Sequence, residues 1–334
     1  MWSIRKDNTN KREETDDDDE IVDNSKPFTL QDVYRNLNKP RLEVLQWFQE
    51  LGLIAREFFC NAPNCSSSMT LAPSTCIDGY QWVCSNRSKK HSFKRSVRKG
   101  TWFEGSRLAM EEIILMIYFW VHEFMQSQVR QELNITNSES VVAYFNYCRE
   151  VAVDVMVKSS QKVGGYGLVV EVIVSKFNRR KPVKGKKSEE QWVYCGVELG
   201  KSTSKCFMEP VDIHYTTTFI EVIKKNVMPG TTIYCECLNV YQEFDLQGLQ
   251  DLCSEHSVAL TDNLTNINTI NQPVEGLWSL LKPTLPPYNR QRDKAMFTGY
   301  LGEYLYRKMI RDSSDKFLRF VNDIATLYEP ATTD

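Results

Sequence analysis

The sequence predicts an α/β protein in which a mixed β-sheet with flanking helices follows a smaller cysteine-rich and helical region. Residues 164–312 alternate strand-like runs rich in Val, Tyr, Phe and Cys with helix-like segments. Residues 58–106 gather Cys, His, aromatic and basic residues. Residues 107–157 have the apolar spacing of helices. The length of 334 residues agrees with two or three domains.

The first 26 residues are strongly acidic. Residues 13–19 hold six acids in seven positions, and such blocks of like charge are usually solvated and disordered. We therefore expect a disordered acidic tail over residues 1–26. The alternatives are a docking site for partners such as chromatin proteins, or an autoinhibitory arm.

The composition indicates a soluble intracellular protein with no membrane partner. The hydrophobic fraction of 42% and the charged fraction of 25% are ordinary for globular proteins. No apolar leader follows Met1, and the longest apolar run, residues 113–121, is too short to span a bilayer. In a reducing compartment the ten cysteines are free thiols or metal ligands, not disulfides.

Helices are expected at both ends of the folded region. Thr29 and Asp32 have the spacing of a helix N-terminal cap, and residues 40–51 repeat apolar residues at helical spacing. Residues 27–57 are therefore predicted to be N-terminal helices. Residues 313–334 are predicted to hold a C-terminal helix, over residues 316–328, followed by a polar tail.

Two pairs of ligand residues predict a zinc ribbon over residues 58–106. Cys60 and Cys65 form the first pair, and Cys84 and His91 form the second. Two such pairs on separate turns build a tetrahedral Zn²⁺ site, and residues 79–84 fit a strand that delivers the third ligand. Cys76 is a competing ligand and His91 the least secure one; a metal-free, degenerate ribbon is the alternative.

Basic and aromatic residues follow the ribbon closely. Lysine and arginine neutralise phosphates, which is the main electrostatic contribution to DNA binding. This density of charge favours DNA binding over a merely solvated face. The basic residues are Arg87, Lys89, Lys90, Lys94, Arg95, Arg98, Lys99 and Arg107, and Phe93, Trp102 and Phe103 lie among them.

Residues 107–160 are predicted to be a helical DNA-binding region. Helices are expected over residues 108–125, 127–133 and 138–156, and the turn before Ser138 resembles a helix-turn-helix corner with Ser138 as its cap. An ordinary helical packing domain is an equally good interpretation of the same pattern. In the DNA-binding interpretation the third helix presents Glu139, Ser140, Tyr144 or Arg149 to a major groove.

The block from 164 to 312 has the order of a ribonuclease H-like domain: three strands, then helix, strand, helix, strand and helix. Such a domain is a mixed sheet with helices on its faces. The strands are expected at 167–175, 191–199, 205–211, 231–237 and 256–261, and the helices at 216–227, 241–255 and 272–282.

Acidic residues stand at two of the three places where such domains bind metal. Glu236 ends a predicted strand and Glu275 lies on a predicted helix. Ribonuclease H-like polynucleotidyl transferases use three carboxylates to hold two divalent metals for phosphoryl transfer. The first strand instead carries Ile173 and Val174 at its centre. Glu171 shares a strand face with Ile173 but lies two residues away, about 6.6 Å along the strand.

Several runs together resemble Merlin-type DDE transposases and their bacterial insertion-sequence relatives, in order over roughly residues 30–310. The resemblance implies a zinc ribbon, a helical DNA-binding region and a ribonuclease H-like catalytic domain. The family's Asp-Glu pair is replaced here by Ile173 and Val174, and its second acid, usually Asp, is Glu236; Glu275 is retained. The matching runs are residues 96–104, 175–181, 191–196, 228–234 and 274–282, beside the four ligand residues.

Two functions follow from this resemblance. The first is a nuclear, transposase-derived DNA-binding protein without catalytic activity, which can form a homo-oligomer. The second is a divergent active transposase or nuclease that uses Glu171, Glu236 and Glu275 with two divalent metals such as Mg²⁺. A decayed coding sequence is a weaker third interpretation.

Overall fold

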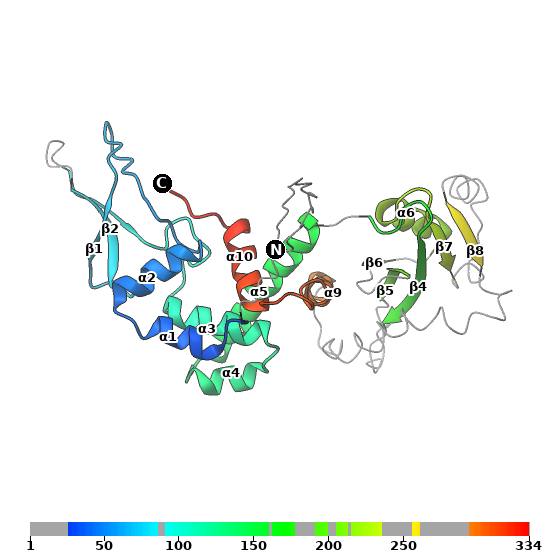
Figure 1. Cartoon of the computed structure of the whole chain (residues 1–334), viewed down its shortest axis with the longest axis horizontal. Helices are drawn as coiled ribbons and strands as arrows, with labels where there is room; N and C mark the ends of the chain where they lie inside the picture. The colour runs from blue at the N-terminus through cyan, green and yellow to red at the C-terminus, as the bar shows by residue number, and fades with distance from the viewer. Residues whose placement is uncertain are drawn as a thin grey trace, which may run out of the picture.

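The computed structural model describes residues 26–85, 91–159, 162–177, 191–199, 205–212, 215–235, 256–260 and 294–333. Within these residues the chain is a mixed α/β protein (Figure 1). The helices are α1 (Leu30–Leu37), α2 (Arg41–Glu50), α3 (Met110–Val121), α4 (Gln126–Glu132), α5 (Ser138–Ser159), α6 (Thr216–Asn226), α9 (Lys294–Met309) and α10 (Lys316–Leu327). The strands are β1 (Thr70–Pro73), β2 (Tyr80–Cys84), β3 (Phe93–Ser96), β4 (Val169–Phe177), β5 (Gln191–Glu198), β6 (Cys206–Val211), β7 (Thr232–Cys235) and β8 (Ser257–Leu260).

The N-terminal half and the C-terminal helix share one hydrophobic core, which joins α1 to α5, the small sheet and α10. The predicted cap of α1 is confirmed: Thr29 and Asp32 form a capping box. Helix α3 is apolar on all sides and is buried within this core. The small sheet is antiparallel, in the order β1-β2-β3.

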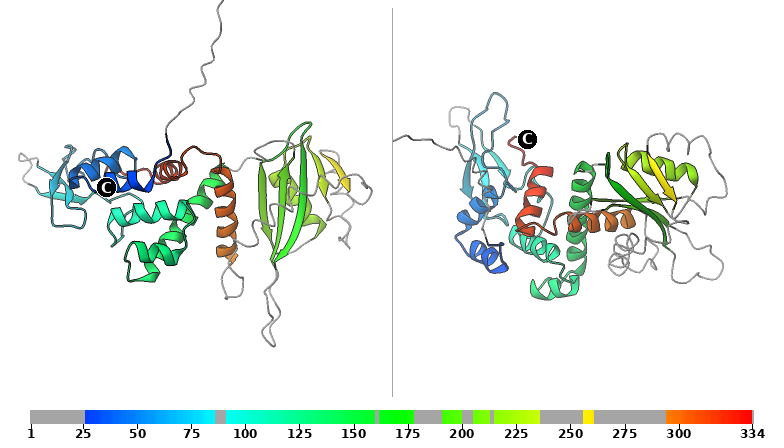
Figure 2. Two further views of the ribbon diagram at one scale, coloured as in Figure 1. Left: turned by 60° about the horizontal axis from the view of Figure 1, so that its bottom comes forward. Right: turned by 45° about the vertical axis from the view of Figure 1, so that its right-hand side comes forward.

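The C-terminal residues return to the N-terminal region. Phe28 stacks between Trp47 and Phe317, at ring centroid distances of 6.2 and 5.7 Å. After α10, the backbone N–H of Phe59 donates to the carbonyl of Thr332 at 2.8 Å. The last described residues therefore lie against the N-terminal region, with Thr332 and Thr333 exposed (Figure 2).

The larger sheet has the order β6-β5-β4-β7-β8. Strands β4, β5 and β6 pair antiparallel, whereas β7 and β8 run parallel to β4. All five strands lie where the sequence predicts them. The helices predicted at 241–255 and 272–282 lie outside the described residues.

The two faces of this sheet pack against different helices. Val170 and Val172 share a cluster with residues of α6, including Phe219. The opposite face, with Ile173, packs against Phe297 and Leu301 of α9. The sheet therefore lies between two helices (Figure 2).

Helix α9 joins the sheet to the helical region, and the sequence prediction missed it. Glu303 of α9 pairs with Arg149 of α5 at 2.8 Å. Gly302 allows this close approach, because a Cβ there would lie 2.6 Å from Val153 Cγ2. Among the described helices, none has the length and apolar character that crossing a membrane requires.

Candidate metal centre and basic surface

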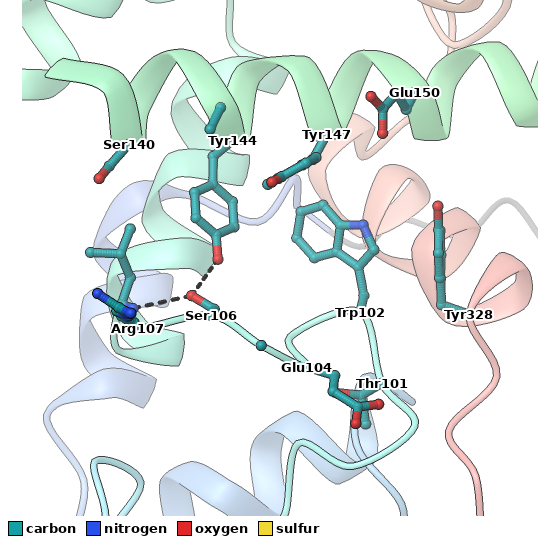
Figure 3. Close-up of a pocket in the computed structure, with 13 residues that line it drawn as sticks. Thr101, Trp102, Glu104, Ser106, Arg107, Ser140, Tyr144, Tyr147, Glu150 and Tyr328 are labelled. Atoms are coloured by element: carbon teal, nitrogen blue, oxygen red, sulfur yellow. Dashed lines mark hydrogen bonds between the residues drawn. The ribbon is translucent and has the colours of Figure 1, made fainter.

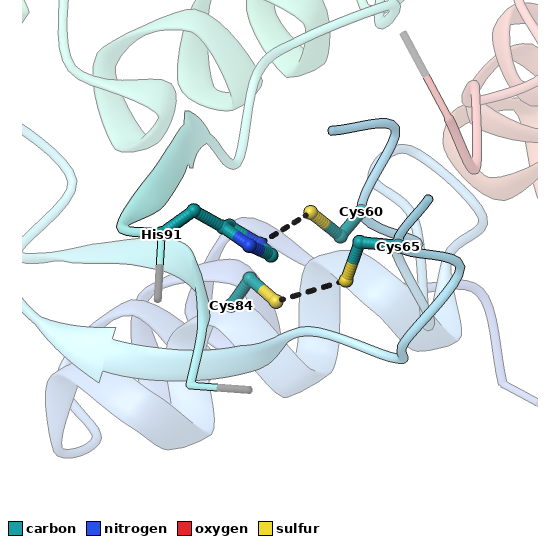
Figure 4. A group of neighbouring side chains, drawn as sticks. All are labelled: Cys60, Cys65, Cys84 and His91. Carbon is teal, nitrogen blue, oxygen red and sulfur yellow. Dashed lines mark hydrogen bonds between the residues drawn. The ribbon is translucent and has the colours of Figure 1, made fainter. Parts of the chain in front are cut away.

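The four predicted ligands converge at one end of the small sheet (Figure 4). Cys60 and Cys65 flank a tight turn, in which the N–H of Cys65 donates to the carbonyl of Ala62 at 2.8 Å. Cys84 ends β2, and His91 lies just before β3, which pairs with β2 through Cys84 and Phe93. A tight turn and a strand pair thus bring the four ligands together.

The ligand atoms have the spacing of a tetrahedral site. They all lie within 4.8 Å of one another, and the three cysteines are buried while His91 is partly exposed. The Cys65 and Cys84 Sγ atoms are 3.8 Å apart, and Cys60 Sγ is 3.3 Å from His91 Nε2. Zinc–sulfur distances of about 2.3 Å place two ligand sulfurs roughly 3.8 Å apart. The arrangement can therefore hold a metal ion such as zinc.

The surroundings favour the thiolate at Cys65. Hydrogen bonds with the Ser67 side chain, and then with the Ser67 backbone, lower the pKa of the Cys65 thiol to about 6. Burial raises the pKa of Cys60, its largest influence. Because the thiolate is the form that ligates metal, Cys65 is already prepared to bind at neutral pH.

Cys76 lies outside this cluster. Its thiol is exposed and donates to the carbonyl of Tyr80 at 3.2 Å. Of the two sets of ligands considered from the sequence, the structure brings together the one with Cys60, Cys65, Cys84 and His91.

The predicted DNA-contacting lysines and arginines fall into distinct groups. Lys94 is exposed on β3, and Arg95 lies over the Phe93 ring, 3.8 Å from its centroid. Lys99 is partly exposed and pairs with Glu104 at 3.0 Å. Lys89 and Lys90 lie outside the described residues. Lys94, Arg95 and Lys99 thus form a basic surface beside the metal centre, which we call the basic patch.

Arg98 has a different role from the one expected. It is 5% exposed, and its guanidinium donates to both carboxylate oxygens of Asp78, at 2.8 and 2.6 Å. It also donates to the carbonyls of Ser106 and Leu108, at 3.1 and 2.7 Å. A guanidinium whose hydrogen bonds are used inside the protein does not reach a phosphate, so Arg98 holds the loop that follows β3.

Replacing Arg98 with alanine should lower the free energy of unfolding by about 3–5 kcal/mol, because Asp78 would keep a buried charge without its partner. Urea unfolding followed by circular dichroism measures this change. Lys99→Ala is the matched control: its exposed ion pair should contribute no more than about 1 kcal/mol. Equal stability of the Arg98 variant and the parent would contradict the assignment.

Tyr144 and Arg149 are also engaged inside the protein. Tyr144 donates from its hydroxyl to the Ser106 hydroxyl at 2.5 Å. Arg149 is buried, pairs with Glu303, and lies over the Tyr300 ring at 4.0 Å. The face of α5 expected to read bases therefore packs against the protein itself.

The start of α5 also differs from the prediction. The Asn137 side chain, not Ser138, accepts the N–H of Glu139 at 2.9 Å, and Ser138 is the first residue of the helix. Glu139 remains exposed and Ser140 partly exposed at this end. Of the four α5 residues expected to contact bases, Glu139 and Ser140, in its first turn, are the two that remain accessible.

The acidic positions are only partly described. Glu171 on β4 is 3% exposed. Ile173 packs against the cluster under α9, whereas Val174 packs against the cluster under α6. Glu236 and Glu275 lie outside the described residues. The described part of this site is therefore an isoleucine in apolar surroundings beside one buried carboxylate.

Comparison with known proteins adds no assignment. A scan against protein-family models found no match, and a search of curated proteins also found none.

Proposed function

We propose that this chain is a transposase-derived DNA-binding protein of the nucleus, similar to Merlin-type DDE transposases, without catalytic activity. The observation on which this rests is the basic patch, Lys94, Arg95 and Lys99, next to a Cys3His cluster. Lys94 and Arg95 on β3 and Lys99 in the turn after it provide cations that phosphates can contact.

Zinc would hold this surface in place. Cys60, Cys65, Cys84 and His91 offer a donor set and a spacing that suit tetrahedral Zn²⁺. A structural zinc in such a site contributes folding free energy, because the unfolded chain has no preformed site. The ligands on β2 and before β3 would thereby fix the strand that presents Lys94 and Arg95.

The larger sheet supports the proposal of a ribonuclease H-like domain. Three antiparallel strands are followed by two parallel ones beside β4, and helices cover both faces. Ile173 supports the loss of chemistry, because it is an apolar side chain packed against the cluster that includes Phe297 and Leu301 of α9. A metal-bridging carboxylate at that place would instead need a cation nearby.

Reversing the charge of the basic patch tests the proposed function. The variant Lys94→Glu, Arg95→Glu, Lys99→Glu should bind duplex DNA more weakly whatever its sequence. The plot of log affinity against log salt should lose about 0.9 of slope for each phosphate contact removed. Fluorescence polarisation at several salt concentrations gives both quantities.

A matched control carries the same charge change elsewhere. Lys158, Lys162 and Lys224 are exposed and lie at the end of α5 or around the larger sheet. Reversing these three should leave the affinity and its salt dependence as in the parent. If both triple variants bind alike, the basic patch is only a solvated face.

A further inference from the structure

Two hollows share part of their lining, and we call them together the composite groove. The first, of about 550 Å³, lies between the loop at residues 101–108, α5 and Tyr328 (Figure 3). The second, of about 380 Å³, lies between that loop, β3 and residues 76–78. Both are lined by Glu104, Gly105 and Ser106. The two hollows therefore adjoin at this short segment of the loop.

The first hollow presents aromatic rings. Trp102, Tyr147 and Tyr328 line it, and Tyr147 is 46% exposed. Tyr144 meets both Trp102 and Tyr147 edge-on, at centroid distances of 6.0 and 5.5 Å. The Tyr144 hydroxyl donates to Ser106, which holds the ring that Trp102 and Tyr147 both contact.

The second hollow presents positive charge. Lys94, Arg95 and Lys99 line it. Its buried Asp78 is paired with Arg98. Glu104 accepts hydrogen bonds from Lys99 and from the N–H of Gly100, at 3.0 and 2.8 Å. Among the residues that line this half, Lys94, Arg95, Arg98 and Lys99 outnumber the two acids, Asp78 and Glu104.

We propose that the composite groove binds an unpaired stretch of nucleic acid, with phosphates on the basic patch and a base stacked on Trp102 and Tyr147. A basic track combined with aromatic faces is how proteins hold single strands, since every base has a face that stacks. A paired base inside a duplex has no free face to offer these rings. The inference rests on the proposed DNA-binding function and adds the form of DNA recognised.

The charge at the far end of the first hollow determines which end of the groove takes the phosphate backbone and which takes the base. Glu150 lines the first hollow near Tyr328, and burial together with Asp154 and Glu150 raises the pKa of the Tyr328 hydroxyl. This acidic end disfavours phosphate and suits the amino edge of a base, since carboxylates accept from such groups. The backbone therefore lies toward Lys94 and the base toward Glu150.

Removing one exposed ring tests the groove. Tyr147→Ala should weaken binding of a labelled single-stranded oligonucleotide by roughly 5- to 150-fold, the range for one stacked base. Duplex affinity should change less than about twofold, because the basic patch is intact. Fluorescence polarisation with the full chain compares both ligands.

Trp102→Ala is a second variant, used only if its circular dichroism matches the parent. Tyr166→Ala is the control, because Tyr166 is 96% exposed near the larger sheet.

The outcomes separate this inference from the proposed function. A parent that binds duplex DNA, with Tyr147→Ala unchanged on single strands, refutes the groove and leaves the basic patch standing. A parent that binds neither ligand refutes both. Equal losses on DNA and RNA single strands are expected, because stacking does not depend on the sugar. If Tyr147→Ala weakened binding of single-stranded RNA but not of single-stranded DNA, the assignment to DNA would be overturned. If it weakened binding of a trimethyllysine peptide alone, the rings would be a site for cations instead.

Discussion

Replacing Cys84 with serine is expected to abolish zinc binding and to unfold the small sheet. Cys84 is buried at the end of β2 and lies 3.8 Å from the Cys65 sulfur. Structural zinc contributes about 10–16 kcal/mol of binding free energy in small zinc modules. This is as large as the whole free energy of unfolding of a typical domain, about 5–15 kcal/mol. The core shared with α3, α5 and α10 should soften as well, because Cys60, Cys65 and Cys84 are part of it.

Metal analysis and thermal unfolding measure this effect. The purified parent should hold about one zinc per chain, from one four-ligand site, and the Cys84 variant none. Cys76→Ser is the matched control, since the Cys76 sulfur is exposed and bonded to the Tyr80 carbonyl. Folded parent protein without zinc would refute the metal site. Loss of zinc from the Cys76 variant would show that Cys76, and not one of the four proposed residues, is a ligand.

The metal ligands were predictable because their geometry is local. Each cysteine pair or cysteine–histidine pair spans one turn or one strand end, so spacing alone restricts where the side chains meet. Arg98 was not predictable in the same way. Its partner Asp78 lies 20 residues upstream, and only the folded hairpin shows that the two charges are buried together.

The periodicity of the sequence predicted the elements but not what covers them. Tyr144 and Arg149 lie on one long helix, and the pattern could not show that Ser106 and Glu303 would occupy their side chains. Helix α9 was missed, although Phe297, Leu301 and Leu305 recur at a spacing of four. The return of the chain to its start was also out of reach, since Phe28 and Asp315 bond across 287 residues.

In the larger sheet, too, the strands could be predicted from the sequence but their packing partners could not. Strands β4 to β8 follow from runs of β-branched and aromatic residues that local pattern reveals. Which face of β4 meets α6 and which meets α9 depends on packing between distant elements. That packing places Ile173, partly buried, against a cluster formed by strand residues and by Phe297 and Leu301 of α9.

The protein is expected neither to cut nor to join DNA. Phosphoryl transfer by such a domain needs two metals about 3.5–4 Å apart, held by shared carboxylates. Ile173 offers none and packs with apolar residues of α9, and Glu171 lies two residues back on the strand. With Mg²⁺ or Mn²⁺, the unmutated protein should neither cleave nor join DNA that carries the terminal repeats of the transposon from which it would derive. Glu275→Gln should behave as the parent does.

Activity in the parent that disappears in Glu275→Gln would overturn this expectation and identify Glu171 as the substitute ligand.

The double variant Ile173→Asp, Glu236→Asp tests the cause of the loss. Its new carboxylate enters an apolar cluster, so the variant should unfold at a lower temperature than the parent without metal. If the substitutions alone removed the chemistry, Mn²⁺ should raise that temperature in the variant and not in the parent, because a ligand that binds only the folded state stabilises it. Cleavage gained by the same variant would then show that the sheet and α9 still leave room for two metals. A variant that neither binds Mn²⁺ nor cleaves would show instead that the packing under α9 has closed the site.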